Sequence, residues 1–227
     1  MREVAGQKTK SKPMQIYIDK TADFVRQRLS NAEAGHDWWH ILRVWNNVKS
    51  LLKHEQADRL TCELAALLHD IADSKFHDGD ETIGPRIAGE FLSRIHVDEP
   101  VITHVQEIIT NLSYKASLGQ VTFHSKELEI VQDADRLDAI GAIGIARAFH
   151  YGGFKNRTLY DPDIQPNLHQ DKETYKHSTA PTINHFYEKL LLLKDKMNTK
   201  AAKQMANERH QFMQQYLAQF FKEWRGN

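Results

Sequence analysis

A histidine and an aspartate lie next to each other inside an apolar stretch of the chain, at His69 and Asp70. The apolar residues around this pair recur at helical spacing, at Leu64, Leu67, Leu68 and Ile71. A buried charge is costly without a partner, so the pair needs a helix cap, an ion pair or a bound cation beside it. An imidazole nitrogen and a carboxylate oxygen are both good ligands for a divalent metal ion. We therefore interpret this stretch as the middle of a helix that carries two candidate metal ligands.

Two further segments hold ligands of the same kinds, each beside an apolar stripe of an expected helix: His40 and Asp135. Together with His69 and Asp70 they supply two imidazoles and two carboxylates. Such a set can bind Mn²⁺, Mg²⁺, Ni²⁺, Fe²⁺, Co²⁺ or Zn²⁺ and leave positions for water or a phosphate oxygen. An ion with open positions lowers the pKa of its water and neutralises charge on a phosphoryl group. The four residues thus predict one divalent metal ion.

Asp133 is an alternative to Asp135 as the last ligand of this set. On a helix, a step of two residues turns the side chain by about 200°, so the two carboxylates cannot share one face. Asp133 and Asp138 also fit a solvent-facing side of the helix or an ion pair with Arg136. Spacing alone leaves the choice between Asp133 and Asp135 open.

Asp73 is a candidate general base. It lies three residues after Asp70 and four after His69, which places all three on one side of a helix. Its carboxylate is suited to orienting or deprotonating an attacking water. A salt bridge to Lys75 or Arg43 is the alternative interpretation.

Other polar and aromatic residues are candidates for contacts with a substrate. His36, four residues before His40, can donate a hydrogen bond to a leaving oxygen or a ligand carboxylate, or form part of the wall of the site. The cations expected to neutralise phosphates are Lys75, Arg136, Arg147, Lys155 and Arg157. The rings suited to stacking on a base are Tyr151, Trp38, Trp39 and Phe154. The alternatives are ion pairs within the protein for the cations and core positions for the rings.

The composition limits the class of protein. The 227 residues carry a formal net charge of +0, so neither a nucleic-acid polymer nor a membrane surface is an expected partner. The longest apolar run, Leu190 to Leu193, is too short to span a bilayer, and the N-terminus does not resemble a signal peptide. The single cysteine, Cys62, excludes an internal disulfide and a cysteine-based zinc cage. We expect a soluble, cytoplasmic protein.

Few glycines and prolines, and long stretches rich in Leu, Ala, Glu, Lys and Gln, favour an all-α fold. Helical spacing predicts helices over 15–28, 38–54, 58–75, 81–95, 98–112, 126–151, 183–197 and 200–224. Residues 1–13 lack periodicity and are expected to be a disordered tail. Residues 14–227 are expected to form a single compact helical bundle. The loop of about thirty residues from Tyr151 to His177 is long enough to indicate a functional role.

The order of the candidate ligands resembles the HD-domain superfamily of metal-dependent phosphohydrolases. The resemblance depends on His40-x-x-Arg43-Val44, Leu67-Leu68-His69-Asp70-Ile71 and Ala134-Asp135-Arg136-Leu137. The longer segments GHDWWH, LLHDIADSKFH and VQDADRLDAIGAIGIAR, with the Tyr-Gly-Gly loop that ends in Tyr160-Asp161-Pro162, are similar to small stand-alone bacterial HD proteins. The resemblance therefore extends over most of the chain.

This resemblance implies an all-helical HD domain that binds one divalent ion, with Mn²⁺ favoured, through the pattern H…HD…D. The ligands are then His40, His69, Asp70 and Asp135. It also implies hydrolysis of a phosphorylated small molecule, a nucleotide, because some similar proteins are nucleoside-triphosphate pyrophosphohydrolases. In related hydrolases of guanosine tetraphosphate an acidic pair follows the doublet, whereas here Ser74 follows Asp73.

Several alternatives stay open at the level of sequence. The protein could be a phosphatase of nucleoside monophosphates or cyclic nucleotides, or a metal-stabilised binding module without turnover. Some HD-like helical folds bind two irons and oxidise substrates, but the sequence offers no clear set of additional ligands. Phenylalanines and methionines in the C-terminal helices are compatible with a homodimer as well as with a core.

Overall fold

The computed structural model describes residues 11–30, 37–72, 80, 82–112, 123–168 and 179–227. Every regular element in this part of the chain is a helix, which confirms the all-α prediction. The chain divides into two units, Met1–Ala134 and Asp135–Asn227, and the division falls inside one continuous helix, α6 (Lys126–Asp138). The single domain over residues 14–227 stays a prediction. None of the described helices is long and apolar enough to cross a membrane.

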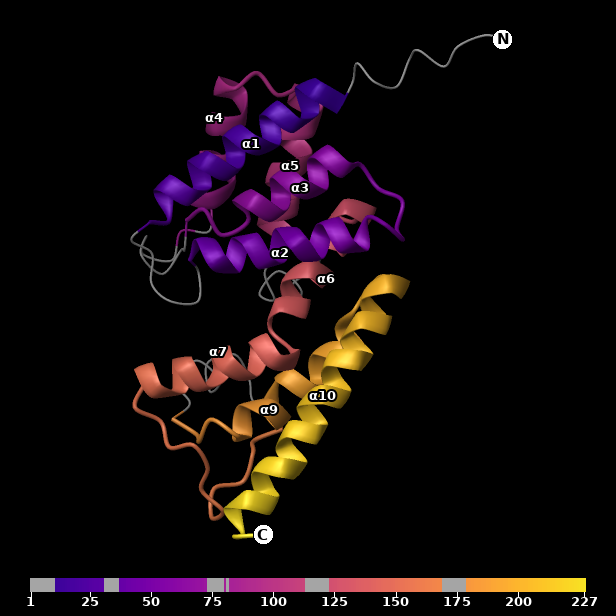
Figure 1. Ribbon diagram of the computed structural model, residues 1–227. Helices are drawn as coiled ribbons and strands as arrows, with labels where there is room; N and C mark the ends of the chain where they lie inside the picture. Colours follow the sequence, from indigo (N-terminus) through magenta and orange to yellow (C-terminus); the bar gives the residue numbers. More distant parts are fainter. Residues whose placement is uncertain (1–10, 31–36, 73–79, 81, 113–122, 169–178) are drawn as a thin grey trace, which may run out of the picture. The chain divides into compact units, whose positions relative to one another are not determined.

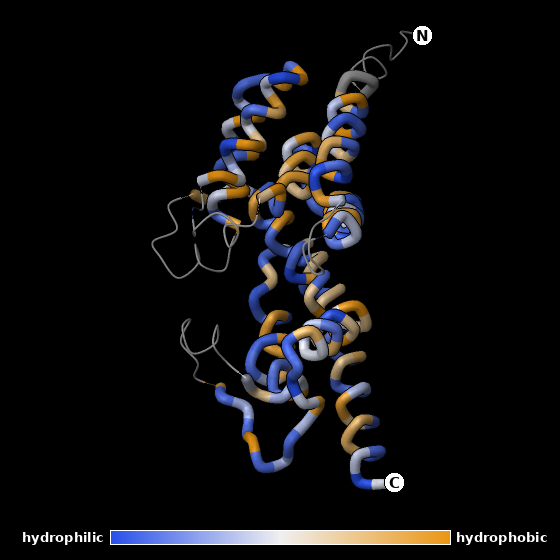
Figure 2. Tube along the Cα trace, turned by 90° about the vertical axis from the view of Figure 1, so that its left-hand side faces the viewer, coloured by the Kyte–Doolittle hydropathy of each residue, from blue (hydrophilic) through white to orange (hydrophobic). Residues whose placement is uncertain are grey.

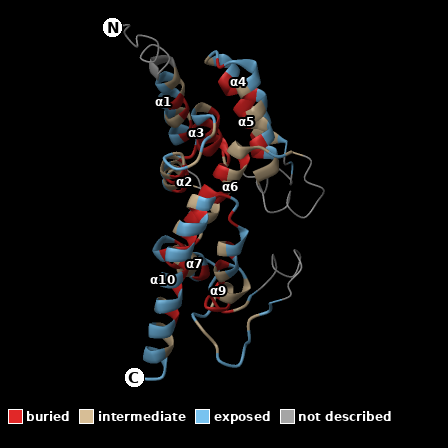
Figure 3. Cartoon of the chain, turned by 90° about the vertical axis from the view of Figure 1, so that its right-hand side faces the viewer, coloured by how far each residue is buried: buried red, intermediate tan, exposed pale blue. Residues whose placement is uncertain are grey.

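The first unit is built around its third helix. Its complete helices are α1 (Ser11–Arg28), α2 (Trp38–Leu51), α3 (Arg59–Leu68), α4 (Ile83–Arg94) and α5 (Glu99–Leu112) (Figure 1). Helix α3 lies against α1, α2 and α5, and α4 lies against α5. Every residue from Thr61 to Leu68 is buried, and α3 is largely red in Figure 3. The end of α3 is therefore fixed by packing on several sides.

A buried polar contact joins α2 to α3. The buried carboxylate of Glu63 accepts a hydrogen bond from Trp45 Nε1 at 2.6 Å and a second one from Arg59 Nε. The Lys49 ammonium lies 3.8 Å from the centre of the Trp45 ring. Burial lowers the pKa of Lys49, while the negative charge of Glu63 acts in the opposite direction. Because a buried carboxylate without partners is costly, these bonds help to fix α2 against α3.

The second unit contains α7 (Gly141–Phe154), α9 (Asn184–Glu188), the 3₁₀ helix η3 (Leu190–Lys196) and α10 (Lys200–Trp224). Helix α10 lies against α7 and η3. Its buried residues recur every three to four positions, at Ala202, Ala206, His210, Met213 and Leu217. Figure 2 shows the matching change between hydrophilic and hydrophobic residues along the helix that leads to the C-terminus. This is the pattern of an amphipathic helix with one face on a core.

Two helix ends differ from the sequence-based predictions in the part of the chain that bears the candidate ligands. Helix α3 ends at Leu68 with His69 as its C-cap, whereas the sequence predicted helix up to residue 75. The predicted helix over 126–151 is two helices, because Gly141 has a φ of +75° and so interrupts the right-handed course after Asp138. The prediction that His69 and Asp70 lie mid-helix was therefore wrong.

Smaller differences occur at both ends of the chain. Helix α1 begins at Ser11, so it includes three residues that were assigned to the disordered tail. The predicted helix over 183–197 is divided into α9 and η3, because Lys189 leaves the helical conformation with φ −144° and ψ −57°. Helix α7 continues to Phe154, which shortens the predicted loop after Tyr151.

Gly144 and Gly153 lie in the same helix, α7, and give a matched test of its packing. A Cβ at Gly144 would lie 2.3 Å from the backbone oxygen of Ala139, so the backbone would have to move, whereas a Cβ at Gly153 would meet nothing within 4 Å. We expect Gly144→Ala to lower the free energy of unfolding by about 1–3 kcal/mol. Gly153→Ala is expected to be neutral or to raise it by up to about 1 kcal/mol. Urea unfolding followed by circular dichroism measures both, and equal effects would contradict the close approach at Ala139.

Candidate metal centre

His40 lies in the first turn of α2, and only 2% of its surface is exposed. Asp37, the N-cap of this helix, accepts a hydrogen bond from the backbone N–H of His40 at 2.9 Å. The cap satisfies one of the N–H groups that a helix start leaves without an intrahelical partner. It thereby fixes the turn from which the imidazole projects.

His69 is the C-cap of α3 and is 9% exposed. Its Nδ1 lies 2.8 Å from the backbone oxygen of Ala66. A carbonyl can only accept, so this contact assigns a proton to Nδ1, and in the neutral ring Nε2 then has the lone pair. This is the arrangement by which histidine ligands of metals are oriented, with one nitrogen bonded to the protein and the other directed at the ion.

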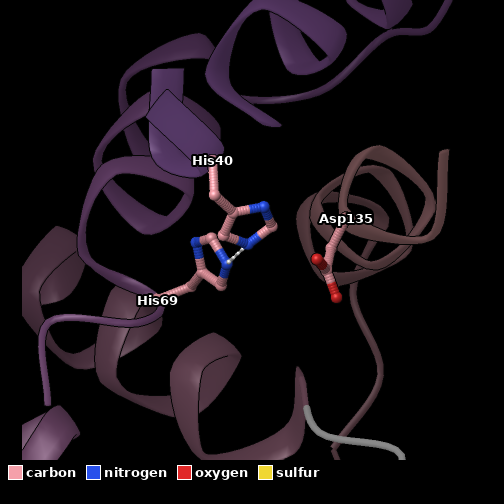
Figure 4. A group of neighbouring side chains, drawn as sticks. All are labelled: His40, His69 and Asp135. Atoms are coloured by element: carbon pink, nitrogen blue, oxygen red, sulfur yellow. Dashed lines mark hydrogen bonds between the residues drawn. The ribbon is translucent and has the colours of Figure 1, made fainter. Parts of the chain in front are cut away.

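Polar atoms of His40 and Asp70 lie close to Nε2 of His69. The two Nε2 atoms of His40 and His69 are 3.3 Å apart, and Asp70 Oδ2 lies 3.5 Å from the first and 3.6 Å from the second. One ligand atom each from His40, His69 and Asp135 lie within 4.8 Å of one another. Figure 4 shows these three side chains directed toward a common point, with Asp135 on its own helix. Asp135 follows Ala134 directly in α6, so the helix that starts in the first unit carries it.

These donors fit a first-row divalent ion. Ligand atoms at about 2.0–2.2 Å from an ion lie about 3 Å from their neighbours in the coordination shell and about 4.4 Å from the ligand opposite. The separations of 3.3, 3.5 and 3.6 Å among His40, His69 and Asp70, and of up to 4.8 Å among His40, His69 and Asp135, approach that range. Mixed imidazole and carboxylate ligands suit Mn²⁺, Fe²⁺, Co²⁺, Ni²⁺ and Zn²⁺. His40, His69 and Asp135 could hold such an ion, and Asp70 Oδ2 lies beside the two imidazoles, so the ligand set expected from the sequence stays a prediction.

The other aspartates of α6 have different surroundings. Asp133 is fully buried, so the solvent-facing interpretation of this residue was wrong. Asp138, also buried, accepts a hydrogen bond from Arg147 Nη1 at 2.6 Å. Arg136, which the sequence offered as the partner of these carboxylates, donates from Nη1 to the backbone oxygen of Lys196 at 2.6 Å. The structure thus gives Arg136 and Arg147, both predicted to bind phosphate, acceptors within the protein.

Of the aromatic residues that were predicted to stack on a base, Trp39, Tyr151 and Phe154 are exposed, whereas Trp38 is half-buried. Tyr151 is 49% and Phe154 is 68% exposed, and both lie near the end of α7. Lys155 Nζ lies 5.8 Å from the centre of the Tyr151 ring and 5.2 Å from that of Phe154. The core interpretation does not hold for these two rings, which form an accessible aromatic and cationic group with Lys155.

Three predicted site residues, His36, Asp73 and Lys75, lie outside the described residues. Helix α3 ends at Leu68, before Asp70, so helical spacing no longer supports a common face for Asp70 and Asp73. The proposed role of Asp73 as a general base therefore rests only on the ability of a carboxylate to accept a proton.

Two buried groups near the candidate ligands were not singled out from the sequence. Asn47, in α2, is 9% exposed and donates from Nδ2 to the backbone oxygen of Ala134 at 2.9 Å. Glu63 is the buried acceptor between α2 and α3 described above. An asparagine seven residues after His40, at a position of the apolar face of this helix, is the sequence signal for the first contact. Cys62 is buried too, and burial raises the pKa of its thiol, so it is a neutral core residue.

Convergence of four donors predicts that divalent ions stabilise the fold. An ion that binds only the folded protein adds about 2.7 kcal/mol when present at a hundred times its Kd. We expect the unfolding midpoint of chelator-treated protein to rise on addition of Mn²⁺ or Co²⁺, measured by thermal unfolding at fixed ionic strength. His69→Ala should remove the rise, and a rise of equal size in that variant would contradict a centre at His69.

Comparisons with known proteins identify the family of the chain. The HD domain family model matches residues 38–140, a span that includes all four candidate ligands. An HD-superfamily hydrolase from Bacillus thuringiensis is 45% identical in sequence, with a TM-score of 0.76, over 94% of this chain and 100% of that one.

A second relative is the Bacillus subtilis protein YpgQ, which is 36% identical over 202 residues, 88% of this chain and 90% of YpgQ. The structure of YpgQ in complex with ADP matches with a TM-score of 0.73 over 93% of this chain and 96% of that one. These relatives cover nearly all of the chain, including the elements that carry His40, His69, Asp70 and Asp135. The chain belongs to the HD domain family of metal-dependent phosphohydrolases.

Proposed function

We propose that the protein hydrolyses a nucleoside triphosphate to the nucleoside monophosphate and pyrophosphate, with one divalent ion, Mn²⁺ favoured, held by His40, His69, Asp70 and Asp135. The observation that carries the proposal is the convergence of two imidazole Nε2 atoms and two carboxylates at the junction of α2, α3 and α6. The ADP in the YpgQ structure supports a nucleotide as the ligand.

The reaction consumes one water. Its oxygen bonds to the α-phosphorus, the bond from that phosphorus to the bridging oxygen of the β-phosphate breaks, and the electron pair leaves with pyrophosphate. A bound divalent ion supplies a Lewis acid that lowers the pKa of water and neutralises phosphate charge. The protein residues orient the donors, and Asp73 is our candidate to accept the proton of the attacking water. His36 is our candidate to hydrogen-bond the leaving oxygen.

Substrate contacts divide into two groups. Tyr151 and Lys155 are exposed and combine a stacking surface with a cation, so we propose that they contact the base and the phosphates of the nucleotide. Lys75 stays a candidate for the phosphates. Arg136 and Arg147 would have to leave Lys196 and Asp138 to bind a phosphate, so they are the weaker candidates.

The test is a panel of nucleoside mono-, di- and triphosphates and cyclic nucleotides, each with Mn²⁺, Mg²⁺, Co²⁺ or Ni²⁺ after removal of metal by a chelator. We expect pyrophosphate and monophosphate in equal amounts from a triphosphate, and ¹⁸O from labelled water in the monophosphate only. Protein with Asp135→Asn, purified in the same way, controls for contaminating phosphatases.

The other outcomes identify the other functions. Orthophosphate from a monophosphate, or opening of a cyclic nucleotide, would replace the proposal with the corresponding phosphatase. Metal binding without turnover of any nucleotide would indicate a binding module.

A further inference from the structure

One buried hydrogen bond links the helix of His40 to the helix of Asp135. Asn47 lies seven residues after His40 in α2, which is almost two full helical turns, so both side chains lie on nearly the same face. The Asn47 amide is buried and donates from Nδ2 to the backbone oxygen of Ala134 at 2.9 Å. Ala134 directly precedes Asp135 in α6.

The hydrogen bond from Asn47 to Ala134 restricts the orientation of α6 relative to α2 as well as the distance between the two helices. A carbonyl in a helix accepts from the N–H four residues later, and its second lone pair is available to a side chain. A side chain of α2 that bonds to this lone pair restricts the rotation of α6 about its own axis. It also restricts sliding of α6 relative to α2. Asp135 is one residue away in the same rigid helix, with its Cα about 3.8 Å from that of Ala134, so its direction is fixed as well.

The amide side chain of Asn47 also indicates a role in orienting α6. Apart from His40, the other buried residues of α2 are apolar, among them Val44, Val48 and Leu51. Apolar packing alone fills space but leaves rotation and sliding less defined than a directional bond does. An amide in the same setting must recover the cost of its desolvation through its hydrogen bonds. Asn47 is therefore chemically suited to orientation rather than to filling space.

We propose that Asn47 is a positioning residue of the metal centre, which sets the carboxylate of Asp135 against the imidazoles of His40 and His69. The inference depends on the metal centre of the proposed function. Asn47 itself is not placed among the ligands, because its amide bonds to Ala134.

The chain supplies a matched control in the adjacent residue. Asn46 precedes Asn47 in the same helix but is exposed. Asn47→Leu keeps the approximate volume and removes the donor, and Asn46→Leu makes the same chemical change at the surface. Asn47→Asp is the second variant, because it keeps the shape and presents a carboxylate oxygen to the Ala134 oxygen in place of the donor.

The measurements are the Kd for Co²⁺ by titration calorimetry, the visible absorption spectrum of the Co²⁺-loaded protein, and the urea midpoint of the metal-free protein. Loss of an outer partner of a metal site lowers metal affinity about 10- to 100-fold. We expect that loss, with a changed Co²⁺ spectrum, for Asn47→Leu and Asn47→Asp, and wild-type values for Asn46→Leu. A purely structural role would move the urea midpoint without moving the spectrum.

The outcomes separate this inference from the proposed function. Wild-type Co²⁺ affinity and spectrum in either folded Asn47 variant would overturn the positioning role. If Asn47→Leu fails to fold, Asn47→Asp decides by the same criteria. Failure of the wild-type protein to bind Co²⁺, or equal binding by Asp135→Asn, would instead overturn the metal centre.

Discussion

Asp135→Asn is expected to lower the affinity for Mn²⁺ or Co²⁺ by more than about 100-fold, and to lower hydrolysis of the nucleotide by at least as much. Loss of a hydrogen-bonded outer partner already costs about 10- to 100-fold in metal affinity, and Asp135 is proposed as a direct ligand. Asparagine keeps the shape of the side chain but removes the anionic carboxylate that supplies a ligand atom within 4.8 Å of those of His40 and His69. Calorimetric titration and the steady-state rate with a saturating nucleotide measure the two losses.

Asp133→Asn is the matched control, because Asp133 lies two residues away in the same helix and is fully buried. Its variant is expected to bind the ion normally and to lose about 1–3 kcal/mol of unfolding free energy, because a buried polar group loses its best partners. The opposite result, with metal lost in Asp133→Asn and kept in Asp135→Asn, would make Asp133 the last ligand.

Phe186→Ala is expected to have the largest effect on stability, about 3–5 kcal/mol. The Phe186 side chain is fully buried in the second unit, with the ring centroids of Phe149 and Tyr216 at 6.0 Å. Truncation removes apolar contacts and leaves a cavity lined by rings that cannot all move to fill it. Urea unfolding, followed by far-ultraviolet circular dichroism, gives the change in free energy.

Phe154→Ala is the control for this variant, since it makes the same change at a ring that is 68% exposed. We expect its unfolding free energy to lie within about 0.5 kcal/mol of the wild-type value. Losses of similar size in the two variants would mean that the aromatic core around Phe186 does not stabilise the second unit as its burial indicates.

The cluster of candidate metal ligands could be predicted from sequence because the residue types are specific and their order along the chain resembles that of a known family. His40, His69 and Asp135 lie far apart in sequence, yet the structure brings their ligand atoms within 4.8 Å of one another. Most helices could be predicted too, because their apolar faces recur at helical spacing. Helix α10, for example, has the predicted bounds of 200–224.

The remaining features depend on conformation or on tertiary contacts. A glycine such as Gly141 is common both inside helices that pack closely and at breaks between them, and only its φ of +75° distinguishes the two cases. The end of α3 at Leu68 places His69 at a helix terminus, where its Nδ1 reaches the Ala66 oxygen. The bond from Asn47 to Ala134 joins residues 87 positions apart, and no local pattern encodes such a pair.

The buried thiol of Cys62 allows local opening around α3 to be measured by alkylation. The protein has one thiol, it lies in the core of α3, and its raised pKa disfavours the reactive thiolate. A thiol-alkylating reagent can therefore modify the folded protein only when α3 separates from its neighbours. The alkylation rate measures how often the helix that ends at His69 comes loose, without any added label or engineered cysteine.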